Sequence, residues 1–204
     1  MKELVILGAS GQGKVVADIA EKAGYDDIII LDDDPSVKLC GKYKVSGTSE
    51  KIDYYRNAEF FSAIGNASIR QKIIETWMNK GFCVATLIHP NAILADESAI
   101  GPGSVVMAGA ILNPYVTIGK GCIVNTGATV DHDCVVGDYC HISVGTHLAG
   151  TVCVGDRTWI GIGAVVSNNI SICSDCVVGA GAVVISDISV PGTYVGVPAR
   201  KIKD

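Results

Sequence analysis

Three ionisable residues stand side by side in a part of the chain that otherwise carries few charges, namely Asp131, His132 and Asp133. A neutral imidazole can accept a proton near pH 7, and a neighbouring carboxylate can orient the ring and stabilise the imidazolium that forms. The pattern predicts His132 as a general base, with Asp133 or Asp131 as its partner. His141 and His147 follow on the same stretch. Two interpretations compete: histidines that only pack at the surface or between subunits, and a zinc site built from histidines.

The element that carries these residues is a six-residue repeat. From Leu94 to Val190 every sixth residue is Leu, Ile or Val, and the position four residues after each of them is mostly small. A period of six with one large aliphatic and one small residue is typical of a parallel β-helix, in which three short sides close one coil. The aliphatic side chain fills the interior and the small residue lies at the corner. Because His132 comes two residues after the inward Val130, we expect its side chain to point away from the interior.

The cysteines follow the same repeat. Four of the eight occupy the small-residue position, where a thiol packs as a compact apolar group: Cys122, Cys134, Cys140 and Cys176. The apolar run Leu4–Leu7 meets Gly8 instead of continuing as an export signal would. We therefore expect reduced thiols and a cytoplasmic location, with a disulfide framework or a metal site as the alternative.

A second candidate site lies near the start of the chain. The sequence GASGQG over residues 8–13 follows an apolar run of strand length and precedes a helical pattern, which is the context of a phosphate-binding turn. A second apolar run, 28–31, ends in three aspartates, and a third strand over 60–64 ends at Gly65-Asn66, before an amphipathic helix over 68–80 with Ile69, Ile73 and Trp77 on one face. A strand over 84–88 completes a small parallel sheet. Ligands bind at the carboxyl ends of such strands, although a tight turn without a ligand remains the alternative.

Composition sets the limits on partners and divides the chain. The net charge of −5 argues against a nucleic-acid partner, and the apolar residues never run for the ~18 positions that a membrane span needs, so no membrane insertion is expected. Residues 1–93 hold 23 charged side chains, whereas residues 94–190 hold 10. We therefore expect a Rossmann-like domain over 1–90 and a β-helix domain with a C-terminal tail over 91–204, joined at His89-Pro90-Asn91.

Five segments together resemble one known family: GASGQGKV, DDD after the second strand, AIGN before a helix, VDHDCVVGDYCHISVGTHLAG and VGVPAR. They are similar to bacterial sugar acyltransferases, which include UDP-4-amino-sugar N-acetyltransferases of the bacillosamine pathway and sialic acid O-acetyltransferases. The resemblance covers essentially the entire chain. It implies a fold of a small α/β Rossmann-like domain followed by an all-β left-handed parallel β-helix, acetyl-CoA as co-substrate without a metal, and homotrimers with active sites between subunits.

The resemblance also implies roles for single residues. His132 would be the general base, with Asp133 raising its basicity at a position where the family more often has Glu. The implied cofactor contacts are His141, Ile162, Ala180 and Gly150, and the implied substrate contacts are Ser10, Gly11, Gln12, Asp32, Asp33, Gly65 and Asn125. Gln12 stands where the family commonly has His, so substrate affinity or sugar identity can differ.

The expected function is N-acetylation of a UDP-linked 4-amino sugar by direct transfer from acetyl-CoA. Two alternatives remain at this point. One is O-acetylation of sialic acid or another sugar, and the other is a nonenzymatic scaffold or sensor that binds nucleotide sugars without binding coenzyme A.

Overall fold

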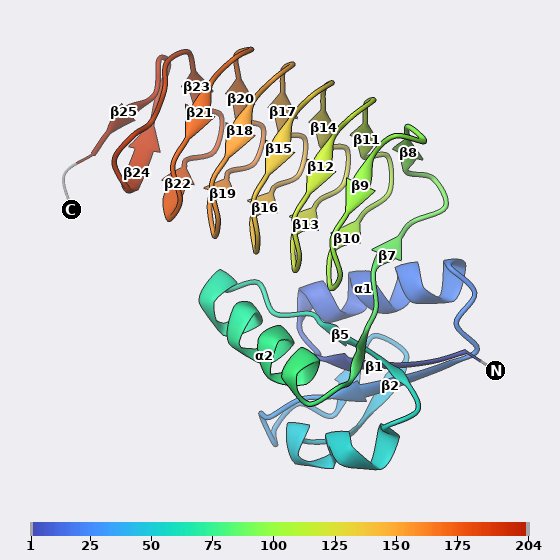
Figure 1. The fold of residues 1–204 in the computed structure, drawn as a ribbon. Helices are drawn as coiled ribbons and strands as arrows, with labels where there is room; N and C mark the ends of the chain where they lie inside the picture. The colour runs from blue at the N-terminus through green and yellow to red at the C-terminus, as the bar shows by residue number, and fades with distance from the viewer. Residues whose placement is uncertain (1, 203–204) are drawn as a thin grey trace. The chain divides into compact units, whose positions relative to one another are not determined.

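The computed structural model describes residues 2–202, and the chain forms two compact units, one up to Pro90 and one from Asn91 onward. Figure 1 shows a mixed α/β unit in blue to green and a ladder of short strands in green to red. Within residues 2–202 no helix has the length and apolar character that a bilayer crossing requires.

The first unit is built on a six-stranded sheet with the order β3-β4-β2-β1-β5-β6. All neighbours pair in parallel except β3 and β4, which are antiparallel. The strands are β1 (Glu3–Leu7), β2 (Asp27–Leu31), β3 (Leu39–Cys40), β4 (Tyr43–Gly47), β5 (Glu59–Ser62) and β6 (Cys83–Val84), and the helices are α1 (Gly11–Lys22), the 3-10 helix η1 (Ser49–Tyr55) and α2 (Ala67–Asn79). Strands β3 and β4 were not predicted from sequence, because no residue of β4 is buried and its sequence has no continuous apolar run.

Two details of this unit correct the sequence expectations. Helix α2 turns Arg70, Ile74 and Trp77 inward, whereas Ile69 is 53% exposed, so the expected inward position of Ile69 is wrong. Arg70 takes the inward place because its Nη1 donates hydrogen bonds to the carbonyl oxygens of Ile64 at 2.9 Å and Gly65 at 2.7 Å. A buried guanidinium that meets backbone carbonyls satisfies its donors.

The single strand expected over 84–88 is also wrong. The N–H of Ala85 donates to the carbonyl of Phe60 at 2.9 Å, so the chain still runs beside β5 at this residue. The chain then leaves the sheet, and β7 (Leu87–Ile88) is not one of its strands.

The second unit is a parallel β-helix with three sheets, named here after a central strand of each. The β14 sheet contains β8 (Ile93–Leu94), β11 (Ile111–Leu112), β14 (Thr129–Val130), β17 (His147–Leu148), β20 (Val165–Val166) and β23 (Val183–Val184). The β15 sheet contains β9 (Ala99–Ile100), β12 (Thr117–Ile118), β15 (Val135–Val136), β18 (Cys153–Val154) and β21 (Ser171–Ile172). The β16 sheet contains β10 (Val105–Val106), β13 (Ile123–Val124), β16 (His141–Ile142), β19 (Trp159–Ile160), β22 (Cys176–Val178), β24 (Gly192–Val195) and β25 (Arg200–Lys201).

The repeat predicted from sequence forms the interior of this unit. Each two-residue strand pairs in register with the strand one coil later, as Val130 does with Leu148, and the repeated aliphatics form one buried cluster. The exception is Val190, which is 52% exposed, so its predicted inward position is wrong. Ile160 pairs with Val178, which lies eighteen residues later in the chain, whereas Val178 pairs with Tyr194, which lies only sixteen residues later. Because the last coil is two residues shorter, Ile188 pairs with Ile172 and takes the inward place expected for Val190, and Tyr194 packs against the interior cluster on the β16 sheet.

The four repeat cysteines lie buried at coil corners, as the sequence predicted. Their thiols donate to backbone carbonyls of the next coil: Cys122 Sγ lies 3.0 Å from the Gly137 oxygen, and Cys140 Sγ lies 3.1 Å from the Gly155 oxygen. Burial raises the pKa of the Cys134 thiol. These cysteines act as small packing groups that also tie neighbouring coils together.

Candidate active site

His132 and Asp133 form the two-residue turn between β14 and β15, at the corner where the β14 and β15 sheets meet. The second residue of this turn has a left-handed backbone, with φ of 58° at Asp133, and the same conformation recurs one coil away at Tyr115 and Thr151, with φ of 63° and 62°. The N–H of Asp133 donates to the Pro114 carbonyl, and the N–H of Thr151 donates to the His132 carbonyl at 2.9 Å. Stacked turns of one shape therefore hold His132 at an outward corner.

The imidazole of His132 is oriented by the next residue. Its Nδ1 lies 2.8 Å from Asp133 Oδ2, and the two side chains are 56% and 53% exposed. A carboxylate accepts here, so Nδ1 carries the proton and Nε2 is left with a lone pair. The hydrogen bond that His132 donates to Asp133 raises the pKa of His132, and the negative charge of Asp131 adds to the effect. The geometry is that of a base that can take a proton on Nε2.

Gly150, one coil later, provides the space for this ring. A Cβ built on Gly150 would lie 2.6 Å from His132 Nε2 and 2.7 Å from its Cε1. Any side chain at this position would displace the imidazole. The structure thus brings together three of the residues that the sequence predicted, His132, Asp133 and Gly150.

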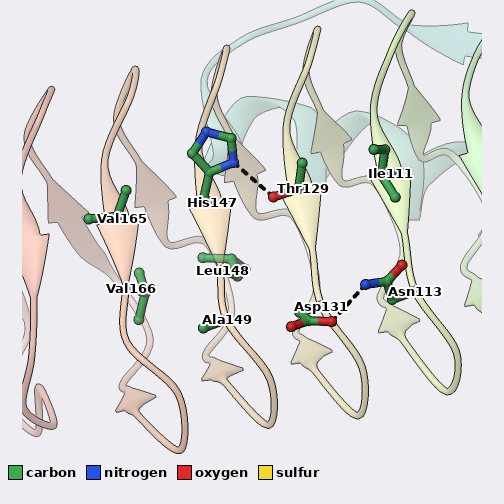
Figure 2. Close-up of a pocket in the computed structure, with 9 residues that line it drawn as sticks. All are labelled: Ile111, Asn113, Thr129, Asp131, His147, Leu148, Ala149, Val165 and Val166. Atoms are coloured by element: carbon green, nitrogen blue, oxygen red, sulfur yellow. Dashed lines mark hydrogen bonds between the residues drawn. The ribbon is translucent and has the colours of Figure 1, made fainter.

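Asp131 joins the turn to the β14 sheet, and its partner Asn113 was not predicted from sequence. Asp131 Oδ1 accepts the backbone N–H of His132 at 2.8 Å and the side-chain amide of Asn113 at 2.6 Å. Figure 2 shows both side chains along one edge of an open groove of about 500 Å³ on the outer face of the β14 sheet. Counting one coil back from Asp131 would have found Asn113.

His147 faces the same groove but is not part of the His132 turn. Its Nδ1 lies 2.8 Å from Thr129 Oγ1, its partner one coil earlier (Figure 2). Within residues 2–202 no three or more His, Cys, Asp or Glu side chains gather in a way that could hold a metal ion.

A second polar group surrounds His141 on the outer face of the β16 sheet. His141 Nε2 lies 3.1 Å from the side-chain nitrogen of Asn125, so two of the sequence-predicted residues are in contact. Trp159 stacks on the His141 ring, with centroids 5.6 Å apart and planes within 2°, and its Nε1 donates to Ser143 Oγ at 2.6 Å. Trp159 was not predicted, although it stands one coil after His141 and pairs with it directly. The stack fixes the plane of the imidazole.

Ile162 and Ala180 lie one above the other at the corner that follows the β16 sheet. The N–H of Gly181 donates to the carbonyl of Ile162 at 2.8 Å, which stacks the two turns. Ile162 is 59% exposed, and Val144, one coil earlier at the same corner, is 43% exposed. These residues form an outward apolar column beside the His141 group.

A single chain does not bring His132 and His141 together. His132 lies at the corner between the β14 and β15 sheets, whereas His141 lies on the third side of the coil. Between them stands the filled interior, where Val130 and Ile142 are fully buried. A site that uses both imidazoles needs His132 from one copy and His141 from another.

In the first unit, the three predicted strand ends meet at one edge of the sheet. The N–H of Gly8 donates to the Leu31 carbonyl, and the N–H of Ala63 donates to the Leu7 carbonyl, both at 2.8 Å. The turn is close-packed where α1 begins, because a Cβ on Gly13 would lie 2.1 Å from the carbonyl oxygen of Gly8. Ser10 caps the start of α1 with its backbone, and Ser10 and Gly11 are exposed.

The aspartates at this edge hold the loops in place, a role that was not predicted from sequence. Asp32 Oδ2 accepts the N–H of Ala9 at 2.7 Å, so it fixes the glycine-rich turn. Asp33 accepts the N–H and the hydroxyl of Ser49 at 2.7 and 3.0 Å. Gly65 lies on the neighbouring loop, whose carbonyls accept from Arg70.

Two polar atoms at this edge lack a hydrogen-bond partner. Among the described residues, Gln12 Nε2 and Ser62 Oγ are the buried side-chain nitrogen or oxygen atoms without one. Gln12 lies in the first turn of α1, and Ser62 ends β5. Buried polar groups are normally satisfied, so these two atoms are candidates for ligand contact.

Comparison with known proteins places the chain in a family. The PglD N-terminal domain model matches residues 3–77. A UDP-N-acetylbacillosamine N-acetyltransferase from Bacillus subtilis (strain 168) is 36% identical over 113 residues, covering 53% of this chain and 52% of that protein, so the match spans about half the length of this curated relative.

Solved structures match over the whole chain. The acetyltransferase domain of PglB from Neisseria gonorrhoeae FA1090 is 38% identical with a TM-score of 0.95, covering 99% of this chain and 100% of that one, and it has also been solved with acetyl coenzyme A. A mutant of perosamine N-acetyltransferase from Caulobacter crescentus, in complex with CoA and GDP-perosamine, is 37% identical with a TM-score of 0.94, covering 100% and 98%. The fold class and the family resemblance expected from sequence are both confirmed. The chain belongs to the family of bacterial sugar N-acetyltransferases that includes these proteins.

Proposed function

We propose that the protein transfers the acetyl group of acetyl-CoA to the amino group of a UDP-linked 4-amino sugar. The observation that carries the proposal is the His132 corner, where Nδ1 is bound to Asp133 and Nε2 lies over a glycine. The names of the relatives support it, since one is a UDP-N-acetylbacillosamine N-acetyltransferase and another a perosamine N-acetyltransferase, and two relatives were solved with acetyl-CoA or CoA.

The chemistry is direct transfer. As the sugar nitrogen attacks the thioester carbonyl carbon, His132 Nε2 takes the proton of the amine, and Asp133 stabilises the imidazolium. The C–N bond forms and the C–S bond breaks, and the proton passes to the departing thiolate, which gives the amide and free coenzyme A. No acyl-enzyme is needed.

The proposal includes a homotrimer with active sites between subunits. The support is that His132 and the His141 group lie on different sides of one coil. In this arrangement His141, Asn125, Ile162 and Ala180 of one subunit contact acetyl-CoA beside His132 of the next, and Gly150 lies against the reacting groups.

The first unit is proposed to bind the nucleotide. Its candidate contacts are Ser10, Gly11, Gln12, Asp32, Asp33 and Gly65, and the unsatisfied Gln12 Nε2 and Ser62 Oγ support a ligand here. Free N–H groups at the start of α1 favour a diphosphate. A GDP-linked 4-amino sugar is the second candidate, because the Caulobacter crescentus relative was solved with GDP-perosamine.

We also propose a cytoplasmic location. All eight cysteines are unpaired, which suits a reducing compartment.

The test is to incubate the protein with acetyl-CoA and, separately, a UDP-4-amino sugar, a GDP-4-amino sugar and sialic acid, followed by mass spectrometry. We expect one acetyl group on the UDP-sugar nitrogen. If only the GDP sugar is acetylated, the substrate is GDP-linked and the proposed UDP sugar is wrong. If only a hydroxyl group is acetylated, transfer to nitrogen is refuted. Nucleotide binding without coenzyme A binding, measured by calorimetry, would indicate a scaffold.

The base is tested with His132→Ala. General-base catalysis contributes about 10² to 10⁴-fold, so we expect turnover to fall by that factor while acetyl-CoA still binds and the oligomer is unchanged. Unchanged turnover would refute the role of His132.

A further inference from the structure

We propose that Asn113 and Asp131 act as a pair of positioning residues that fix the turn carrying His132. This inference rests on the proposed role of His132 as the base. It concerns residues that do not touch the reacting atoms and act through the His132 backbone.

The pair is built by the coil stacking itself. Asn113 and Asp131 each follow a strand of the β14 sheet at the same register position, since Leu112 pairs with Val130. The N–H of Asn113 donates to the Val130 carbonyl, and the N–H of Asp131 donates to the Leu148 carbonyl, both at 3.0 Å. Both side chains point outward along the groove edge in Figure 2. Their backbones are therefore fixed on two successive coils before the side chains meet.

One carboxylate oxygen then links the sheet to the turn. Asp131 Oδ1 accepts the Asn113 amide at 2.6 Å and the N–H of His132 at 2.8 Å. Ala149, which takes the same register position in the next coil, has no side-chain polar atom to offer. Asn113 is thus the donor from a neighbouring coil that holds the Asp131 carboxylate where it can receive the His132 N–H.

The imidazole needs this support because more than half of its side chain is exposed. Its contacts are Asp133 on the same turn and the bare backbone of Gly150. A rotation of the His132 peptide would move both Nε2 and the Asp133 contact. Anchoring the N–H of His132 resists that rotation.

Asp131 also contributes charge. The ionisable groups that act on His132 are Asp133 and Asp131 on its own turn. The turn one coil earlier carries the phenol of Tyr115, and the turn one coil later, Gly150 and Thr151, carries no ionisable side chain. The hydrogen bonds from Asn113 and the His132 N–H lower the pKa of Asp131 and keep it ionised. Loss of this charge should lower the pKa of His132, because Asp131 is one of the groups that raise it.

The experiment compares Asn113→Ala, Asn113→Asp and Asp131→Asn with Ser167→Ala, a control at the same register position two coils beyond Asp131. The protein is labelled with ¹³C-histidine, and the titration of His132 is followed by NMR, together with kcat and the KM for acetyl-CoA. We expect Asn113→Ala to lower kcat by about tenfold, as for loss of a hydrogen bond to a charged group, with KM unchanged. Asn113→Asp should lower kcat further, because it places a second carboxylate against Asp131. Asp131→Asn should move the His132 titration to lower pH, and Ser167→Ala should change nothing.

Wild-type kcat and wild-type His132 titration in both Asn113 variants would overturn the proposal. If Asn113→Ala fails to fold, Asn113→Ser, which keeps a short donor, takes its place with a smaller expected loss of kcat. The two proposals fail separately. If His132→Ala keeps full turnover, the assignment of His132 as the base is wrong. If the titration of His132 still shifts in Asp131→Asn, the effect of Asn113 and Asp131 on the imidazole stands.

Discussion

Replacing Gly150 with alanine gives the sharpest test of the His132 corner. The new methyl would lie 2.6 Å from Nε2, 2.7 Å from Cε1 and 3.2 Å from Cδ2 of His132. Carbon atoms in contact prefer separations of about 3.5 to 4.0 Å, so the ring has to move by about 1 Å. Gly150 has no left-handed backbone, so alanine should not strain the turn.

A misplacement of about 1 Å at a reacting group can cost about 10²-fold in rate. We expect Gly150→Ala to lower kcat by that order while the KM for acetyl-CoA stays within about twofold. Turnover is followed by the appearance of the coenzyme A thiol with a saturating amino sugar. Asn168→Ala, at the same corner one coil later, is the matched control and should keep its rate. An unchanged kcat in Gly150→Ala would refute the placement of the imidazole, and a raised KM with unchanged kcat would show that Gly150 serves the cofactor instead.

Three further predictions concern the partner of His132, the stack on His141 and the last coil of the second unit. Asp133→Asn should lower kcat and move the acid limb of the pH–rate profile to lower pH, because the base acts in its neutral form and the hydrogen bond that raises the pKa of His132 is weakened; an unmoved acid limb in a pH series, with Asp18→Asn on α1 as control, would contradict this. Trp159→Ala should raise the KM for acetyl-CoA by about 2- to 10-fold, since an aromatic pair contributes about 0.5–1.5 kcal/mol, and Trp159→Phe should keep most of the affinity; equal KM values in all three proteins would show that the stack on His141 is not used. Ile172→Ala should cost about 2–5 kcal/mol in urea unfolding, whereas Val190→Ala should cost under about 0.5 kcal/mol; equal costs would mean that the last coil keeps the six-residue register.

Much of the β-helix can be predicted from sequence because its pattern is strictly local. A period of six fixes which residues face inward, and Val130, Ile142 and Ile160 are all fully buried as predicted. The same count places His132 at an outward turn. In the first unit, the apolar runs that became β1 and β2 and the glycine-rich turn that starts α1 were equally visible, since each is one continuous segment.

The errors occur where a distant contact outweighs the local pattern. Arg70 replaces Ile69 on the inner face of α2 because the loop carbonyls of Ile64 and Gly65 need donors. Val190 leaves the interior because Ile188 takes its place beside Ile172 in a coil two residues shorter. Neither exchange can be read from the spacing of the apolar residues in the sequence.

The sequence by itself therefore determined the repeat, the outward placement of His132 and Asp133, and the residues available for chemistry. The tertiary structure alone decided what surrounds each imidazole: Asn113 behind Asp131, Gly150 under His132 and Trp159 on His141. These neighbours are about one coil apart in sequence, and their contacts arise from the register in which the coils stack. Periodicity specifies the face on which a side chain lies, whereas the in-register hydrogen bonds between coils specify which side chain it meets.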